Sequence, residues 1–324
     1  MRIVKTGSYL PDTIVTNDDL AEYLDTSDEW IQKRTGIKKR HVAKGDSIES
    51  MAYKAVEDLF FNSIGTVVDK NDNSDLTDKV NCGETIDFII VATMSHKSSS
   101  PGIANLIQAR LGITQVFCLD ISAACNGFIA ALSVANGLLK TPTYGRGLVI
   151  GVEKMSDILD WTDRSTACLF GDGAGCVLVE ASDALVYAES ISSDGAHGED
   201  LKAPLEQAKL EMNGRGIFNF VSREVPKNIL STISKAGQSI KAIDYVLAHQ
   251  ANKRLLGMIS KKTGITEDKF LSNIDDVANT SAASIPLLLD KVVKDGIITL
   301  EGKQLVVFVG FGGGLNWGSI VTLV

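Results

Sequence analysis

Two apolar runs of the same type and order constrain this chain more than any other feature. Ile86–Ala92 and Ile243–His249 each begin Ile-Asp-aromatic, continue as a buried strand pattern, and precede a loop and a helical pattern. A second apolar run follows each of them, because Leu148 lies 62 residues after Ile86 and Val306 lies 63 residues after Ile243. The matched spacing suggests an internal duplication, although strands of any α/β protein can fall at similar spacings by chance.

Helical patterns fill the intervals between these strands, over residues 102–111, 125–140, 252–263 and 282–295. Strands that are apolar throughout imply sheets covered by helices on both faces, so the pattern predicts a layered α/β fold. At 324 residues the chain exceeds the size, about 250–300 residues, at which one core tends to divide. We therefore expect two core-forming halves, residues 1–180 and 181–324.

The charge balance narrows the possible partners. The chain has 40 Asp and Glu against 32 Lys and Arg, a formal charge of −8, which is the wrong sign for a general nucleic-acid or anionic-membrane binder. A local basic patch stays compatible with that total. No run approaches the roughly 18 apolar residues of a membrane span, and the first residues lack a signal-peptide pattern. We expect no nucleic-acid or membrane partner and a cytoplasmic location.

Cysteine and histidine spacings give no sign of a metal or disulfide framework. The five cysteines form no CxxC pair, and the four histidines show no close i, i+4 pairing. One segment fits the α/β pattern poorly: Asn62–Thr85 is polar and rich in turn residues. Long structureless loops are uncommon in compact domains, so we interpret it as a surface insertion, with a short hairpin as the alternative.

Cys125 is the first candidate for chemistry, because it lies where a strand ends and an apolar helix begins. A thiol at a helix N-terminus meets unpaired N–H groups and the positive end of the helix dipole, which predicts a lowered thiol pKa. The structural alternative is a small buried hydrophobic residue, the usual environment of a free cysteine. The residues alone leave both interpretations open.

Two further polar residues lie at comparable positions. His249 ends the second copy of the repeated strand, where α/β folds collect ligands and catalytic groups, and Asn279 precedes another helix. A capped core histidine and a plain N-terminal capping cluster with Thr280 and Ser281 are the structural alternatives. If the three elements end at one place, they supply a nucleophile, a general acid or base and an uncharged donor, a set suited to thioester chemistry.

Glycines follow the last buried strand, in Phe311-Gly312-Gly313-Gly314. Bare backbone can approach a ligand closely, and a free N–H there can form an oxyanion hole with the N–H of the nucleophile. A tight turn between strands is the alternative. The other glycine-rich stretch, Gly171–Cys176, fails the dinucleotide fingerprint because its sixth position is cysteine and a strand follows.

The chain resembles the β-ketoacyl-acyl carrier protein synthase III family, initiating condensing enzymes of the thiolase fold. The matching motifs run from end to end: Gly7–Pro11, Thr26–Ile31, Arg34–Ile37, Ala123–Cys125, Phe170–Gly175, His249–Asn252, Asn279–Ser284, Phe311–Gly314 and Trp317–Gly318. The resemblance implies a duplicated α-β-α-β-α five-layer architecture, a homodimer, and no cofactor other than coenzyme A thioester as substrate.

The resemblance also implies the roles of the candidate residues. Cys125 would be the nucleophile, His249 the catalytic histidine and Asn279 its amide partner, although plant-type polyketide synthases share this triad. An acyl group would pass from coenzyme A to Cys125, and malonyl-acyl carrier protein would lose carbon dioxide and attack the thioester. His249 and Asn279 would stabilise the enolate, while the N–H groups of Cys125 and Gly313 would form the oxyanion hole. Phe311 would disfavour the malonyl carboxylate in the ground state.

Substrate contacts are implied in the same way. Trp30 and Arg34 share one face of a helix that a Thr26…Glu29 capping box is expected to open; a surface aromatic under an arginine stem is the alternative. The resemblance places Trp30, Arg34 and Arg164 around coenzyme A, and Asn252 near its pantetheine. A basic face of Arg254, Lys261 and Lys262 would attract an acidic carrier protein, although such runs are more often only solvated surface.

Three departures from the family pattern concern specificity. Ser100 occupies a place where a phenylalanine of the partner subunit often closes the acyl pocket, so a longer or branched acyl group becomes possible. Asn219 falls where a basic carrier-docking residue is common, and Asn62–Thr85 is longer than in typical members. The leading hypothesis is condensation of an acyl-coenzyme A primer with malonyl-acyl carrier protein in fatty acid initiation. A specialised condensing enzyme or acyl transferase of secondary metabolism is the alternative, and a silent carrier-binding scaffold is disfavoured by the intact triad.

Overall fold

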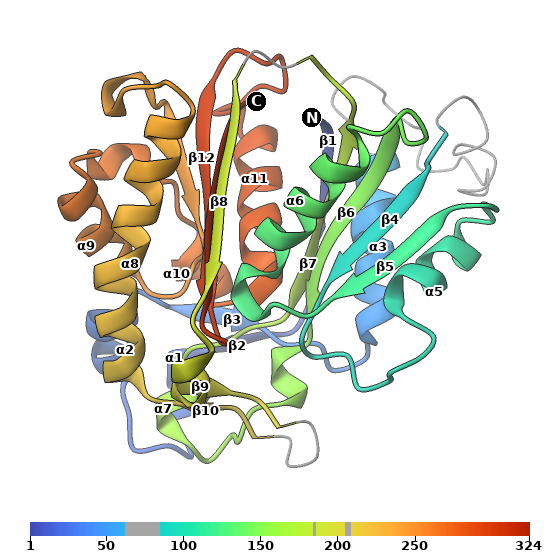
Figure 1. Ribbon diagram of the computed structural model, residues 1–324. Helices are drawn as coiled ribbons and strands as arrows, with labels where there is room; N and C mark the ends of the chain where they lie inside the picture. Colours follow the sequence, from blue (N-terminus) through green and yellow to red (C-terminus); the bar gives the residue numbers. More distant parts are fainter. Residues whose placement is uncertain (62–84, 184–185, 205–208) are drawn as a thin grey trace.

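A five-stranded sheet forms the framework of the first half of the protein (Figure 1). The computed structural model describes residues 1–61, 85–183, 186–204 and 209–324, so the segment 62–84, and with it the expected insertion, lies outside the described residues. β4 is parallel to β5 and β6, whereas β7 is antiparallel to β6 and β1. The spatial order is β1 (Arg2–Tyr9), β7 (Gly173–Glu180), β6 (Arg146–Glu153), β4 (Phe88–Ala92), β5 (Phe117–Ile121).

A second sheet repeats this topology with later strands. Its β11 is parallel to β12, and β13 is antiparallel to both β12 and β8. An isolated parallel bridge between Val246 and Phe270 stands where the first sheet has its fifth strand. The order is β8 (Tyr187–Ser193), β13 (Asn316–Leu323), β12 (Leu305–Gly312), β11 (Tyr245–Ala248). The duplication predicted from the matched strand spacing is therefore confirmed.

Helices divide the space around the two sheets into layers, as Figure 1 shows. Two helices lie between the sheets, α6 (Gly127–Leu138) and α11 (Ser284–Lys294). On the outer face of the first sheet lie α3 (Ile48–Phe61) and α5 (Ile103–Arg110), and on the outer face of the second lie α8 (Gly214–Lys235) and α9 (Lys253–Thr263). The α-β-α-β-α architecture and all four predicted helical segments are confirmed.

The main core lies between the sheets. Phe88 and Phe308, one from the central region of each sheet, are fully buried there together with Phe128 of α6 and Leu288 of α11. Burying such a side chain contributes about 1.5–3 kcal/mol. A helix between two sheets buries most of its surface, which explains why the sequence of α6 is largely apolar, with only a narrow exposed strip that includes Val134. These two helices are thereby held rigidly, each with its N-terminus at the same end of the molecule as the candidate site.

Short elements cluster at that end, in the lower part of Figure 1. They are β2 (Ile14–Thr16), α1 (Asn17–Ala21), α2 (Asp28–Thr35), β3 (Lys39–His41), α7 (Arg164–Ala167), β9 (Leu201–Lys202) and β10 (Glu211–Met212). The short helix α10 (Ile274–Val277) packs against β3. The predicted Thr26…Glu29 capping box is wrong, because Ser27 is the N-cap of α2 and its hydroxyl accepts from the Trp30 N–H at 3.2 Å. Adjacent hydroxyl residues make this one-residue shift hard to see in the sequence. Within the described residues, no helix is both long and apolar enough to cross a bilayer.

Candidate active site

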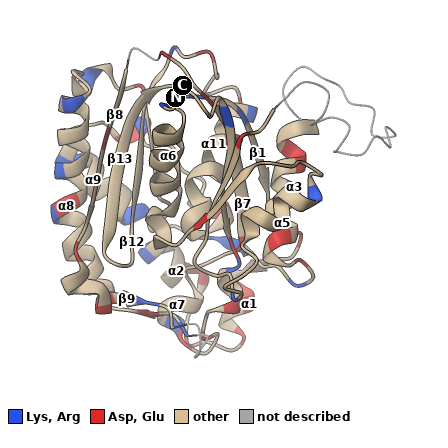
Figure 2. Ribbon diagram, turned by 45° about the vertical axis from the view of Figure 1, so that its right-hand side comes forward, with Lys and Arg blue, Asp and Glu red and all other residues tan. Residues whose placement is uncertain are grey.

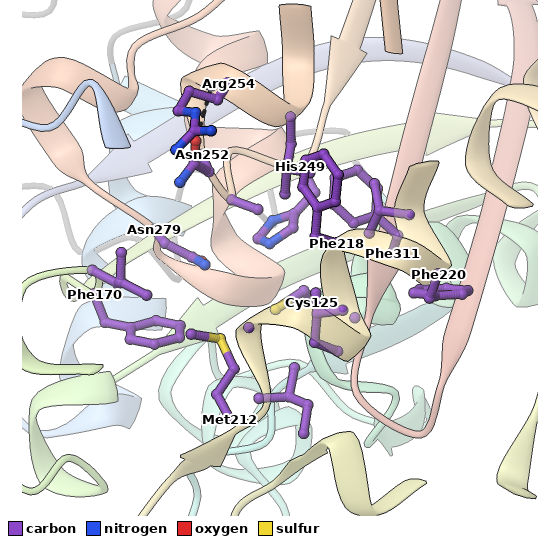
Figure 3. Close-up of a pocket in the computed structure, with 18 residues that line it drawn as sticks. Cys125, Phe170, Met212, Phe218, Phe220, His249, Asn252, Arg254, Asn279 and Phe311 are labelled. Atoms are coloured by element: carbon purple, nitrogen blue, oxygen red, sulfur yellow. Dashed lines mark hydrogen bonds between the residues drawn. The ribbon is translucent and has the colours of Figure 1, made fainter. Parts of the chain in front are cut away.

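Cys125, His249 and Asn279 line one cavity of about 380 Å³ (Figure 3). Cys125 comes from the 3-10 turn between β5 and α6, His249 directly follows β11, and Asn279 bridges to Phe170 beside the start of α11. The three segments converge because Cys125 and Asn279 lie just before α6 and α11, the two helices between the sheets, and His249 directly follows strand β11 of the second sheet. The sequence-based expectation that these side chains meet is thus correct in the structure.

The local backbone presents Cys125 at the cavity. The turn Ala124–Asn126 runs directly into α6, and Ala124 adopts a left-handed φ of 47°. Gly312 lies against it, since a Cβ at that position would be 2.8 Å from the Cβ of Cys125 and 2.9 Å from its N. Only glycine fits this close approach. The glycine run also forms the turn from β12 to β13, so the turn interpretation is confirmed, whereas the oxyanion hole stays a prediction.

The predicted lowering of the Cys125 pKa is wrong. The side chain is 5% exposed, and burial raises the pKa of the thiol to about 12. The Ser281 side chain lowers the pKa but does not offset the burial. Desolvation of the thiolate therefore outweighs the end of the helix dipole, and the resting group is a neutral thiol at neutral pH.

His249 is also neutral in its resting state. The ring is 1% exposed, and burial lowers its pKa to about 3 although a hydrogen bond to the Ser281 backbone favours the protonated form. Its Nδ1 lies 2.7 Å from the Ser284 Oγ, which leaves Nε2 for a substrate. The Phe311 ring packs against it edge to face, with ring centroids 5.3 Å apart. The imidazole is thus held in one orientation by a hydroxyl and an aromatic ring.

Asn279 presents its amide NH2 to the cavity. Its Oδ1 accepts a hydrogen bond from the Ser281 N–H at 2.8 Å, so the amide nitrogen points the other way, toward Cys125 in Figure 3. Its backbone is fixed by hydrogen bonds with Leu169 and Gly171, both at 3.0 Å. The capping interpretation was partly right, because the side chain does satisfy a backbone donor at the start of a helical turn. The same bond orients the amide as a donor.

The rest of the cavity wall is largely apolar. Residues of β9, β10, α8 and α9 supply it: Leu201, Met212, Ile217, Phe218, Phe220, Val221 and Leu255. An apolar chamber beside a thiol and two uncharged donors suits a ligand with an alkyl or pantetheine-like portion and a reactive carbonyl. Phe218 is 43% exposed, which places an unusual amount of aromatic surface at the entrance.

Trp30 lies between two arginines outside the cavity. The guanidinium carbon of Arg34 is 4.4 Å from its ring centroid and that of Arg164 is 4.8 Å away. Asn252, which lines the cavity, donates to the backbone carbonyl of Arg34 at 3.0 Å and so connects the two regions. Cationic and aromatic groups arranged in this way can bind a nucleotide base and its phosphates.

The remaining predicted residues lie at different distances from the cavity. Arg254 lines its entrance at the start of α9, while Lys261 and Lys262 are exposed near the end of that helix. Figure 2 shows basic residues on α8 and α9. Asn219 is exposed on α8. Ser100 is exposed and does not line the cavity of this single chain, and Gly313 lies behind Gly312, near Ala124.

Sequence reasoning missed three polar residues that support the site. Ser284 contacts His249, Ser281 contacts Cys125 and Asn279, and Glu153 accepts from the Ser281 hydroxyl at 3.0 Å. Glu153 did carry a signal, since an acidic residue at the end of a buried apolar strand is unusual. No group of three or more His, Cys, Asp or Glu side chains in the described part of the chain is arranged to hold a metal ion.

Two family models match this chain. One is described as 3-oxoacyl-[acyl-carrier-protein (ACP)] synthase III and matches residues 119–195; the other is described as the C terminal part of the same enzyme and matches residues 233–323. The β-ketoacyl-[acyl-carrier-protein] synthase III of Lactococcus lactis subsp. lactis is 45% identical over 334 aligned positions, covering 99% of this chain and 98% of that protein.

Solved structures are similar over the whole chain. The 3-oxoacyl-[acyl-carrier-protein] synthase III of Aquifex aeolicus has a TM-score of 0.89 and 37% identity, covering 100% of this chain and 99% of that one. The priming β-ketosynthase of the R1128 polyketide biosynthetic pathway has a TM-score of 0.88 and 29% identity, covering 100% and 96%.

Proposed function

The chain belongs to the 3-oxoacyl-[acyl-carrier-protein] synthase III family, acyl-transferring condensing enzymes of fatty acid initiation, and from this premise we propose which residues perform each step. Cys125 accepts the acyl group of an acyl-coenzyme A primer. Malonyl-acyl carrier protein then loses carbon dioxide, and its carbanion attacks the acyl-Cys125 thioester to give a 3-oxoacyl-carrier protein. The convergence of Cys125, His249 and Asn279 in one apolar cavity is the observation that supports this assignment.

Acyl transfer uses backbone donors. As the Cys125 sulfur attacks the thioester carbonyl, the N–H groups of Cys125 and Gly313 stabilise the oxyanion. The close contact of Gly312 with the Cys125 backbone supports this role, because it holds the glycine run against the nucleophile. Removing one such donor typically costs about 100- to 1,000-fold in rate.

Decarboxylation uses the two neutral side chains. Nδ1 of His249 lies 2.7 Å from the Ser284 Oγ, and for this step we propose the tautomer in which Ser284 donates to Nδ1 and the ring hydrogen is on Nε2. Nε2–H and the Asn279 amide then donate to the thioester oxygen as the enolate forms. Phe311 keeps the region beside His249 apolar, which disfavours the malonyl carboxylate and favours its loss.

Coenzyme A binds at the entrance. Trp30 stacks the adenine, Arg34 and Arg164 bind its phosphates or cover the ring, and Asn252 contacts the pantetheine. The Arg164 guanidinium lies over the Trp30 ring and donates to Asp25. An adenine that stacks between Trp30 and Arg164 would therefore displace this exposed arginine. Its exposure supports such a movement, since few contacts would be lost.

The acidic carrier protein docks on the basic residues of α9. Arg254 at the cavity entrance and Lys261 and Lys262 further along the helix supply positive charge on a protein whose formal charge is −8. A local patch of this kind accelerates encounter with an acidic partner. We also propose a cytoplasmic homodimer, in which Ser100 of one subunit lies near the acyl pocket of the other.

The primer is the least specified part of the reaction. A serine at position 100 in place of a bulky residue would leave space for a longer or branched acyl group. The similarity to a priming β-ketosynthase of a polyketide pathway favours one alternative, a condensing enzyme or acyl transferase of secondary metabolism with an unusual acyl donor. Release of carbon dioxide from a malonyl thioester during turnover distinguishes condensation from simple acyl transfer.

Intact mass spectrometry after incubation with a panel of acyl-coenzyme A esters tests the assignment. We expect a single acyl adduct on wild type, none on Cys125→Ala, and a maximal adduct yield with the preferred primer. An adduct that persists in Cys125→Ala would overturn the nucleophile assignment.

A further inference from the structure

Glu153, the last residue of β6, is a buried carboxyl whose position the steps above do not use. Its side chain is 0% exposed. Oε2 accepts hydrogen bonds from the Ser95 Oγ at 2.5 Å and from the N–H groups of Ser95 and Met94 at 3.1 and 3.2 Å. Over the described ranges of the chain, no lysine, arginine or histidine forms an ion pair with it. A buried carboxyl without a cationic partner is costly, which points to a function.

Ser281 connects this carboxyl to the nucleophile. Its hydroxyl donates to the Glu153 Oε1 at 3.0 Å, and the turn Ser281–Ala283 packs against the turn Ala124–Asn126 that carries Cys125. Ser281 is accordingly one of the influences that lower the pKa of the Cys125 thiol against the effect of burial. The residue adopts a left-handed φ of 48°, which is uncommon for a residue other than glycine, and Ala283 N–H and the Asn279 side chain hold the turn in place. A hydroxyl both donates and accepts, so Ser281 can pass a proton between its two neighbours.

His249 is a poor acceptor for the thiol proton. Burial lowers its pKa to about 3, whereas burial raises the pKa of Glu153 to about 7. The carboxylate is therefore the stronger base of the two groups that reach the Cys125 turn. In the tautomer proposed above, Nε2 of His249 already carries a hydrogen and serves as a donor to the enolate.

We propose that Glu153 accepts the Cys125 proton through Ser281 during acylation and returns it to the Cys125 sulfur after condensation. As the S–C bond to the acyl carbonyl forms, the S–H proton moves to the Ser281 Oγ and the Ser281 proton moves to the Glu153 Oε1. Coenzyme A leaves as a thiolate and takes a proton from solvent. When condensation breaks the Cys125 S–C bond, the thiolate recovers its proton along the same path.

The relay also removes the negative charge of Glu153 before malonyl-acyl carrier protein reacts. While Cys125 is acylated, Glu153 is a neutral acid, so no carboxylate lies near the malonyl carboxylate or the developing enolate. The titratable groups that face Glu153 across Ser281 are Cys125 and, through the Ser281 backbone, His249. The neighbouring charges face elsewhere: Lys154 contacts Asp157 and the Asp46 carbonyl, and Asp172 contacts Ser156 and the Ala43 N–H.

The inference rests on Cys125 being the acylated residue, and rapid-quench mass spectrometry with acetyl-coenzyme A tests the two separately. If wild type forms no adduct on Cys125, the proposed function fails. If wild type does form the adduct, we expect the acylation rate to decrease as the pH is lowered through about 7, because Glu153 becomes protonated there. Glu153→Gln and Ser281→Ala should each lower the acylation rate about 100-fold at pH 7.5, in line with the loss of a general base. The decrease in rate on the acidic side of the pH profile, its acidic limb, should be absent in both variants.

Two controls separate a proton relay from a structural role. Ser95→Ala removes a contact to the other carboxylate oxygen and should acylate within about threefold of wild type, because the relay to Oε1 stays intact. In a Cys125→Ala background, Glu153→Gln should leave carbon dioxide release from malonyl-coenzyme A unchanged. Equal losses in acylation and decarboxylation, or an acidic limb that persists in both relay variants, would overturn the proposal.

Discussion

The two halves of this protein share a scaffold and differ at the ends of their strands. Ala92 of β4 is paired with Gly151 of β6, and Ala248 of β11 is paired with Val309 of β12 in the same parallel arrangement. The residue after β4 is Thr93 and the residue after β11 is His249. Two positions beyond the paired residues lie Glu153 in one half and Phe311 in the other.

The turns before the central helices are equivalent too. Ala124–Asn126 precedes α6 and Ser281–Ala283 precedes α11, and the first residue of each turn has a left-handed φ, 47° and 48°. Cys125 therefore corresponds to Ala282. One half supplies a thiol and a carboxyl, and the other supplies an imidazole, an amide and an aromatic ring.

This comparison shows how a duplicated fold can build an asymmetric site. The repeat brings two sets of strand ends and two helix starts to one place, and substitution at equivalent positions then gives each half a different chemical task.

Loss of the nucleophile should have the largest effect. Cys125→Ala should lower condensation by about 10⁴-fold or more, because no covalent acyl intermediate forms. Adding Ala282→Cys should not restore activity, since Ala282 lies in the central core and does not line the cavity. Turnover assays and adduct mass on the double variant check this. Recovered activity would mean that the two turns are functionally equivalent.

Loss of the enolate donors should have the next largest effect. His249→Ala and Asn279→Ala should each slow decarboxylation by about 100- to 1,000-fold, because each removes a donor to the developing charge. Acyl-Cys125 formation should persist in both variants. Thr93→Ala, at the position equivalent to His249, is the matched control and should retain decarboxylation. Carbon dioxide release and adduct formation, measured side by side, separate the two steps; a parallel loss of both in the histidine variant would contradict the assignment.

The close approach of Gly312 gives a third prediction. Gly312→Ala should slow acylation by about 100-fold and reduce stability by about 1–3 kcal/mol, because the new methyl group meets the Cys125 backbone. The equivalent position of the first half is Lys154, where a full side chain fits. Thermal unfolding and the rate of thiol alkylation measure the two effects. An alanine variant with a native alkylation rate would show that the turn can shift without cost.

The titrations of Glu153 and His249 should change the free energy of unfolding with pH in opposite directions. His249 has its pKa lowered from 6.5 to about 3, so the unfolded chain binds a proton that the folded chain does not, and stability rises with pH in that range. Glu153 has its pKa raised from 4.5 to about 7, so the folded chain holds a proton that the unfolded chain releases, and stability falls as pH rises in that range.

The two slopes overlap between about pH 4.5 and 6.5, where each amounts to about 1.4 kcal/mol per pH unit. Glu153→Gln should therefore make stability rise more steeply with pH than in wild type, and His249→Gln should change the slope in the opposite direction. Denaturant unfolding at several pH values measures both. Curves that run parallel to wild type in both variants would show that neither group titrates in this window.

Much of the fold could be predicted from the sequence because its central strands are buried on both faces. The run 86–92 contains β4, and the run 243–249 contains β11, since continuous apolar residues leave few alternatives. The meeting of Cys125, His249 and Asn279 could be expected because strand ends and helix starts gather at one end of an α/β layer. The family resemblance supplied their roles and the five-layer architecture.

The remainder depended on contacts that no local pattern reveals. The helix dipole at Cys125 is a local property, whereas the burial that raises its pKa comes from tertiary packing. Glu153 and Ser281 are 128 residues apart, so their hydrogen bond could not be read from either motif. The cap of α2 shifted by one residue because Thr26 and Ser27 are both suitable and only the backbone geometry decides between them.

The outer helices provide the smallest expected effect. α9 carries Arg254, Lys261 and Lys262, whereas the basic residue of its counterpart α5, Arg110, lies 3.6 Å over the Tyr53 ring. Reversing both lysines to glutamate should raise the KM for malonyl-acyl carrier protein about five- to tenfold, because only the encounter with an acidic partner is weakened.

Acylation by acyl-coenzyme A should stay unchanged in that double variant, and added salt should reduce the difference from wild type, since exposed charges are screened. Lys303→Glu, an exposed charge reversal outside the cavity, is the matched control. Equal changes in KM for the α9 variant and this control would mean that total charge, and not the second-half helix, attracts the carrier. A change confined to α9 would show that the halves diverged on their outer layers as well as at their strand ends.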